Sequence, residues 1–109
     1  MFKTDQIIET PRERAMRVIR QIITDKLRDI PSRVYLMGSC ARGDNSRYSD
    51  IDIAIETLQP ASKTLISDIR DLLEQSDVPF LVDIFDFSQL EERYQTEIKK
   101  EGVLWIAPP

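Results

Sequence analysis

Three aspartates and one Gly-Ser pair are the residues whose types and spacing could do chemistry in this chain. Gly38 and Ser39 follow the apolar residues 34–37, and ten residues separate Ser39 from Asp50. A small turn at the end of a strand can approach a phosphate closely. Asp50 and Asp52 are one residue apart, so on a strand both would project from the same face, about 7 Å apart at their Cα atoms. These parts together suit a metal-bound nucleoside triphosphate.

The residues around the Gly-Ser pair add hydrogen-bond donors for an anion. Gly38 can adopt a backbone conformation closed to other residues, and Ser39 offers a hydroxyl and a main-chain N–H. If a helical turn starts near Cys40, its free N–H groups point at the same anion. Arg42 and Arg47 can add charge-assisted contacts to phosphate oxygens.

Asp83 lies within the largely apolar residues 80–87, where an ionised carboxylate is costly unless it is paired or metal-bound. Asp52 is also unusual, since Asp is depleted inside strands, whereas Asp50 is readily explained as the start of a strand. Three carboxylates on adjacent strands would repel one another, and a divalent cation would relieve that repulsion. Unrelated turn and strand acids remain the alternative. Asp86 falls on the opposite strand face and is expected to cap or to be solvated.

The amino-acid composition limits which metal ions and which classes of partner are expected. The chain has no histidine and only one cysteine, Cys40, which leaves almost no ligands for zinc and excludes histidine-dependent acid–base chemistry. Cys40 itself is expected to be a small buried side chain. The metal should therefore be a hard, oxygen-binding ion such as Mg²⁺. The net charge of −4 argues against a groove for nucleic acid, and the N-terminal arginines fit a solvated helix face.

Length and hydropathy predict one cytoplasmic, soluble domain over residues 1–109. An apolar content of 41% is enough for one core but not for two. The chain has no apolar stretch near the roughly 20 residues that a membrane span needs, and no signal sequence at its start. We therefore expect no membrane association.

Hydrophobic periodicity predicts the elements that must position the candidate site. Thr10, Pro11 and Glu13 form a capping signal for the first helix, and Gly102 is expected to stop the last one. The expected helices are 10–29, 62–75 and 88–100, with a short helix or turn at 40–47. The expected strands are 34–37, 49–56 and 80–87, with a short terminal strand at 103–106. Residues 103–106, which include Trp105, are expected to pack in the core or along the sheet edge, and a partner interface is the alternative. This order indicates an α/β or α+β fold, a small mixed sheet flanked by helices.

On these residues the sequence resembles the minimal nucleotidyltransferase (MNT) family of the DNA polymerase β-like nucleotidyltransferase superfamily. The family pattern is Gly-Ser, about ten residues, Asp-x-Asp, and a third acid on a later strand. It stands here as Gly38-Ser39, Asp50-Ile51-Asp52 and Asp83, and the fuller form Gly-Ser-x-Ala-Arg-Gly is met at residues 38–43. The resemblance spans about residues 30–106 and implies the polymerase β-like nucleotidyltransferase fold.

The resemblance also implies roles for the motif residues. Gly38 and Ser39 would hold the triphosphate of ATP, and Asp50, Asp52 and Asp83 would be catalytic and bind two Mg²⁺ ions. Asp83 would also help to deprotonate the attacking hydroxyl. Two further nucleotide contacts are expected from the motif, at Arg42 and Ser49.

The acceptor is inferred from kinship. With 109 residues, no acceptor-binding second domain is expected, so the acceptor should be small or bring its own surface. Stand-alone members resemble the antitoxins of two-gene modules whose toxin is a HEPN-domain protein, typically a ribonuclease. The resemblance implies AMP transfer from ATP to a toxin hydroxyl, a tyrosine being the expected one. Two alternatives remain open: an antitoxin that masks the toxin by binding alone, and a nucleotidyltransferase for small molecules such as aminoglycosides.

Overall fold

A four-stranded mixed sheet organises residues 8–38 and 51–108, the part of the chain that the computed structural model describes. Its strands are β1 (Ser32–Met37), β2 (Ile51–Thr57), β3 (Val82–Asp86) and β4 (Val103–Ile106), in the spatial order β3-β2-β1-β4. β1 is antiparallel to both β2 and β4, whereas β2 and β3 run parallel. The predicted mixed sheet is thus confirmed, and the expected turn at 40–47 lies outside the described residues.

The first helix, α1 (Pro11–Lys26), begins where the capping signal predicts. The Thr10 hydroxyl accepts a hydrogen bond from the Glu13 N–H at 3.0 Å, and the Glu13 carboxylate accepts one from the Thr10 N–H at 2.9 Å. These two bonds satisfy donors that the start of a helix otherwise leaves unpaired.

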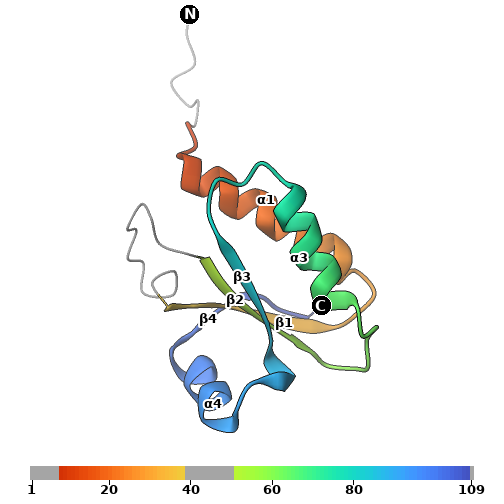
Figure 1. Ribbon diagram of the computed structural model, residues 1–109. Helices are drawn as coiled ribbons and strands as arrows, with labels where there is room; N and C mark the ends of the chain where they lie inside the picture. The colour runs from red at the N-terminus through yellow and green to blue at the C-terminus, as the bar shows by residue number, and fades with distance from the viewer. Residues whose placement is uncertain (1–7, 39–50, 109) are drawn as a thin grey trace, which may run out of the picture.

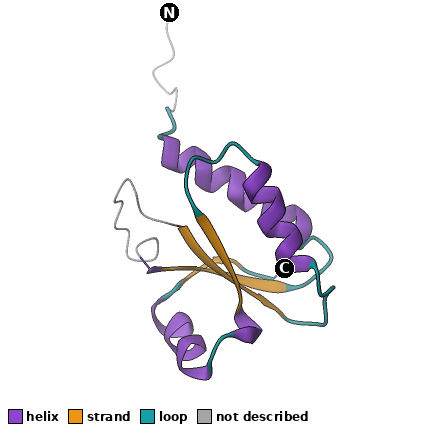
Figure 2. Cartoon of the chain, in the orientation of Figure 1, coloured by secondary structure: helices purple, strands orange, loops and turns teal. Residues whose placement is uncertain are grey.

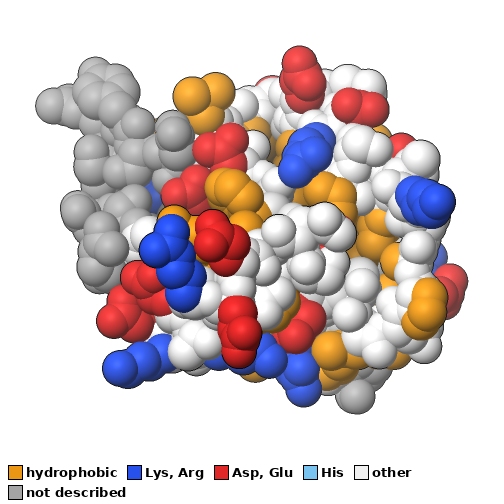
Figure 3. Space-filling view, turned by 60° about the horizontal axis from the view of Figure 1, so that its bottom comes forward, with side chains coloured by type: hydrophobic (Ala, Val, Ile, Leu, Met, Phe, Trp, Pro, Cys, Tyr) orange, Lys and Arg blue, Asp and Glu red, His pale blue; other side chains and the backbone are white. Residues whose placement is uncertain are grey.

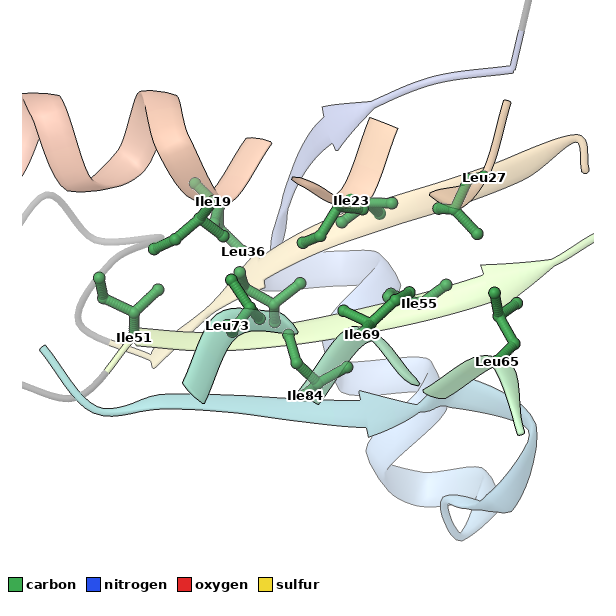
Figure 4. Packing of buried hydrophobic residues seen from close by; sticks show 12 residues of the cluster. Ile19, Ile23, Leu27, Leu36, Ile51, Ile55, Leu65, Ile69, Leu73 and Ile84 are labelled. Carbon is green, nitrogen blue, oxygen red and sulfur yellow. The ribbon is translucent and has the colours of Figure 1, made fainter. Parts of the chain in front are cut away.

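α1 and α3 (Leu65–Gln75) cover one face of the sheet and enclose the main core (Figure 1). Alternation along β2 sends its isoleucines to this face, where Ile51, Ile53 and Ile55 are fully buried. Figure 4 shows side chains from both helices pointing toward those of the strands. The central members of this cluster are Ile19, Ile23, Val34, Ile51, Ile53, Ile55, Ile69 and Ile84.

A short 3₁₀ turn, η1 (Phe87–Gln89), and α4 (Glu92–Glu101) follow β3, and α4 lies across the other face of the sheet (Figures 1 and 2). The prediction of one helix from residue 88 is wrong at its start. The Asp86 carboxylate accepts hydrogen bonds from the Ser88 N–H at 3.0 Å and the Ser88 hydroxyl at 2.7 Å, which stabilises the turn. Asp86 is thus a cap, as predicted.

Two arginines tie helices to the edges of the sheet. Arg70 of α3 donates to the Ile84 carbonyl oxygen of β3 at 2.8 and 3.2 Å. Arg20 of α1 is exposed, as expected for a solvated helix face, but it also donates to the Trp105 carbonyl oxygen of β4 at 2.6 Å. Trp105 packs against the main core, which confirms its predicted role. Among the described residues, no helix has the length and apolarity that crossing a membrane requires.

Candidate functional site

The end of β1 brings Gly38 against a carboxylate of β2. Met37 pairs with Asp52 in the antiparallel register, so the residue after Met37 turns beside Asp52. Gly38 has a φ of +59°, a left-handed conformation that side chains disfavour. A Cβ atom at this position would lie 3.3 Å from Asp52 Oδ2. Glycine is therefore required at position 38 by its backbone conformation and favoured by its close approach to Asp52.

Asp52 and Asp83 lie side by side on parallel strands. They are register partners between β2 and β3, and the hydrogen bond from the Ile51 N–H to the Leu81 carbonyl oxygen, 2.9 Å long, fixes this register. Register partners project from the same face, and the strands of a sheet lie about 4.8 Å apart. Asp52 is half-buried and Asp83 is exposed. Two carboxylates from segments far apart in sequence thus share one sheet face.

The donor chemistry of this pair fits a hard divalent cation. Carboxylate oxygens are the ligands that Mg²⁺ prefers, and a cation between two neighbouring carboxylates removes their mutual repulsion. Asp50, the third expected ligand, lies outside the described residues, as do the candidates Ser39, Arg42 and Ser49. Within residues 8–38 and 51–108, no three such groups come together as a metal site. The described residues therefore supply part of the predicted ligand set, Asp52 and Asp83.

A groove of about 430 Å³ opens beside Gly38, between α4 and the sheet. The sheet contributes Met37 and Phe85, and α4 contributes Tyr94, Glu97, Ile98 and Glu101. On the face of the molecule that carries α4, acidic side chains lie next to exposed hydrophobic ones (Figure 3). The sequence analysis missed this groove. A signal was present, because the four α4 residues recur at the spacing of one helix face.

Farther along the same sheet face, a polar cluster ties α4 to the strands. The Glu56 carboxylate accepts a hydrogen bond from the Tyr35 hydroxyl at 3.1 Å and forms an ion pair with Lys99 at 3.4 Å. Burial raises the pKa of the Tyr35 phenol above its ordinary value, and the hydrogen bond to Glu56 raises it further. The Tyr35 ring stacks on Phe87, with 5.7 Å between ring centroids. Tyr35 is thus a packing residue on this face of the sheet.

Known proteins with a similar sequence or fold were found for this chain. A protein of Haemophilus influenzae named "Probable protein adenylyltransferase MntA" is 26% identical over 87 residues, which cover 80% of this chain and 71% of that protein. A crystal structure of a toxin–antitoxin with AMP-PNP is similar at a TM-score of 0.60 and 27% identity, covering 78% of this chain and 71% of that one. A mutant of the toxin–antitoxin MntA-HpeT matches in fold, with a TM-score of 0.63, 21% identity, and coverage of 82% and 70%.

The family match covers most of the chain. Residues 18–107 match the family described as Polymerase beta, Nucleotidyltransferase, a range that includes β1 to β4 and the whole Gly-Ser to Asp83 pattern. The sheet with helices on both faces agrees with the fold predicted from the resemblance. The chain therefore belongs to the polymerase beta nucleotidyltransferase family.

Proposed function

We propose that this chain is an antitoxin enzyme that transfers AMP from ATP to a hydroxyl of a toxin protein and thereby neutralises it. The observation that carries the proposal is the in-register pairing of Asp52 with Asp83 next to Gly38. Membership in a nucleotidyltransferase family supports the reaction type. The similarity to a protein named as a protein adenylyltransferase, and to a toxin–antitoxin with AMP-PNP, supports the nucleotide and the class of acceptor.

In this proposal some motif residues bind the nucleotide and the aspartates hold the metal ions. Gly38 and Ser39 hold the phosphates, and Arg42 and Ser49 add contacts to the nucleotide. Asp50, Asp52 and Asp83 would hold two Mg²⁺ ions, which supply charge neutralisation at the phosphates and acidify the acceptor hydroxyl.

The transfer is an in-line displacement at the α-phosphorus. An Asp83 carboxylate oxygen accepts the proton of the acceptor hydroxyl, whose oxygen forms a bond to the α-phosphorus. The bond from the α-phosphorus to the bridging oxygen breaks, and pyrophosphate leaves. Asp83 is exposed on an edge strand, and its neighbour Leu81 is 73% exposed, so a hydroxyl on a protein surface can reach this position.

The partner in this proposal is a HEPN-domain ribonuclease toxin, modified on a tyrosine in the cytoplasm. The net charge of −4 suits docking to an RNA-binding, basic protein. Complementary charge raises the association rate of such partners. Salt screens this attraction, so the association rate should fall as the salt concentration rises.

Intact mass spectrometry of the toxin tests the transfer. After incubation with the chain, ATP and Mg²⁺, the toxin should gain one or more AMP masses. Asp52→Asn and Asp83→Asn should each lower the rate at least about a hundredfold, since both remove ligands that act in the transition state. Asp86→Asn is the matched control, because Asp86 caps η1 and the amide oxygen of the substituted side chain can still accept the hydrogen bond from Ser88. Transfer at the wild-type rate by both site variants would refute the proposed chemistry.

Stoichiometric masking of the toxin is the second candidate, and an exposed apolar edge favours it. Val103 and Leu104 of β4 are 42% and 48% exposed. If Asp52→Asn still neutralises the toxin in cells while Leu104→Asp abolishes association, masking is the mechanism. Leu104 is a better probe than Trp105, because Trp105 packs on the core and its loss would disturb the fold.

A further inference from the structure

The groove beside Gly38 lies on the same sheet face as the carboxylate pair, and two of its lining residues neighbour that pair. Met37, which lines the groove, is the register partner of Asp52. Phe85, another lining residue, follows Asp83 by two positions and so lies on the same sheet face. A ligand with one part at Gly38 and Asp52 would therefore lie next to this groove.

The side chains of the groove select against phosphate. Among the described residues that line it, none is Lys or Arg, and the charged ones are Glu97 and Glu101. Carboxylates repel a polyphosphate but accept hydrogen bonds from hydroxyl and amino groups. The remaining lining is mostly apolar, as in small-molecule sites, whose volumes are typically about 300–1,000 Å³.

Tyr94 provides an aromatic surface in this groove. Its side chain is partly exposed, at 44%. The Arg93 guanidinium lies over the ring, 4.7 Å from its centroid, and donates to the Tyr94 hydroxyl at 3.1 Å. A partly exposed aromatic ring can stack with a planar heterocycle. Glu97 and Glu101 lie on the same helix face, one and two turns farther along.

We propose that the groove between α4 and the sheet binds the nucleoside half of the nucleotide. The base stacks on Tyr94, and Glu97 or Glu101 accepts hydrogen bonds from the ribose hydroxyls or an exocyclic amine. The triphosphate, the charged half, lies at Gly38 and the carboxylate pair. This inference rests on the proposed function, because it extends the same nucleotide away from the Gly38 turn.

Two ligands separate the halves of this site: AMP-PNP with Mg²⁺, and inorganic tripolyphosphate with Mg²⁺. In isothermal titration, Tyr94→Ala should weaken AMP-PNP binding about tenfold, as expected for loss of base stacking, and leave tripolyphosphate binding unchanged. Tyr94→Phe keeps the ring and should bind AMP-PNP within about twofold of wild type. Lys100→Ala, an exposed change on α4 outside the groove lining, is the matched control.

Amide chemical shifts of the wild-type protein give a second test that needs no variant. AMP-PNP should shift the amides of Tyr94, Glu97 and Glu101 more than tripolyphosphate does. The inference is overturned if the two ligands cause the same shift changes at these amides and Tyr94→Ala binds AMP-PNP as tightly as wild type does. It is also overturned if Tyr94→Ala lowers transfer to the toxin without weakening AMP-PNP, because the groove then serves the acceptor. Failure of the proposed function looks different: the wild-type chain binds AMP-PNP but transfers nothing to a toxin.

Discussion

Replacing Gly38 with alanine tests how tightly the turn after β1 is built against Asp52. At a φ of +59°, an L-residue with a Cβ pays about 1–2 kcal/mol relative to glycine. The new Cβ would also lie 3.3 Å from Asp52 Oδ2, so the carboxylate must move by a few tenths of an ångström. We expect Gly38→Ala to lower the free energy of unfolding by about 1–2 kcal/mol through the backbone, and by a further amount through the crowding of Asp52. For a domain of this size, each kcal/mol lowers the Tm by roughly 4–8 °C.

Urea unfolding followed by circular dichroism measures this loss, and two further variants separate its causes. Gly38→Asn should lose less than Gly38→Ala, since Asn tolerates the left-handed region better. In an Asp52→Ala background, Gly38→Ala should lose only the backbone part, because the crowded carboxylate is gone. The difference between the two backgrounds is the coupling energy of Gly38 with Asp52.

Two results would refute this reasoning. Gly38→Ala with the unfolding free energy of wild type would mean that the turn does not need a glycine. An unchanged loss in the Asp52→Ala background would mean that the close approach to Asp52 costs nothing. Because the crowding moves a proposed metal ligand, Gly38→Ala should also lower AMP transfer more than its loss of folded protein explains.

Two further predictions concern α4 and the polar cluster beneath it. Gly102→Ala should lower the free energy of unfolding by about 1–3 kcal/mol, measured by urea unfolding. The added Cβ would lie 2.6 Å from the Ile98 carbonyl oxygen and 3.2 Å from the Leu36 carbonyl oxygen. A loss no larger than that of Lys100→Ala would contradict this prediction. Burial, with the hydrogen bond to Glu56, raises the pKa of Tyr35 in the folded protein. The contribution of the neutral phenol to the free energy of unfolding is therefore complete below the unfolded-state pKa of about 10, and it is lost as the pH rises through the folded-state pKa. Urea unfolding at about pH 9 and 11 should therefore show a smaller alkaline loss for Tyr35→Phe than for wild type; equal losses would contradict it.

Local signals predicted most of the fold. The capping box at Thr10 and Glu13 marked the start of α1, and the alternation of isoleucines along β2 showed which face is buried. The predicted start of the last helix was wrong because hydrophobic periodicity alone placed residues 88–91 in that helix. There the Asp86 side chain stabilises a 3₁₀ turn instead, a local hydrogen bond that hydrophobic spacing does not report.

The candidate site was harder to predict than the strands that carry it. The sequence indicated that Asp52 and Asp83 are costly inside strands, but their register depends on the crossover through α3. The groove depends on the packing of α4 across the sheet, which no single segment encodes. Gly102 was expected only to stop a helix, yet its φ of −72° is available to any residue, and nearness to two carbonyl oxygens is what requires it. The boundaries of a single domain over 1–109 stay a prediction.

The hydrogen bonds from Arg70 to the Ile84 carbonyl oxygen bear on the solubility of the folded chain. β3 is an edge strand, and an unpaired edge is a template on which a strand of another molecule can add. The guanidinium occupies the carbonyl at the middle of this edge, so a foreign strand would have to displace two hydrogen bonds to pair along it. The crossover helix that orders the parallel pair of strands thus also protects the sheet from edge-to-edge aggregation.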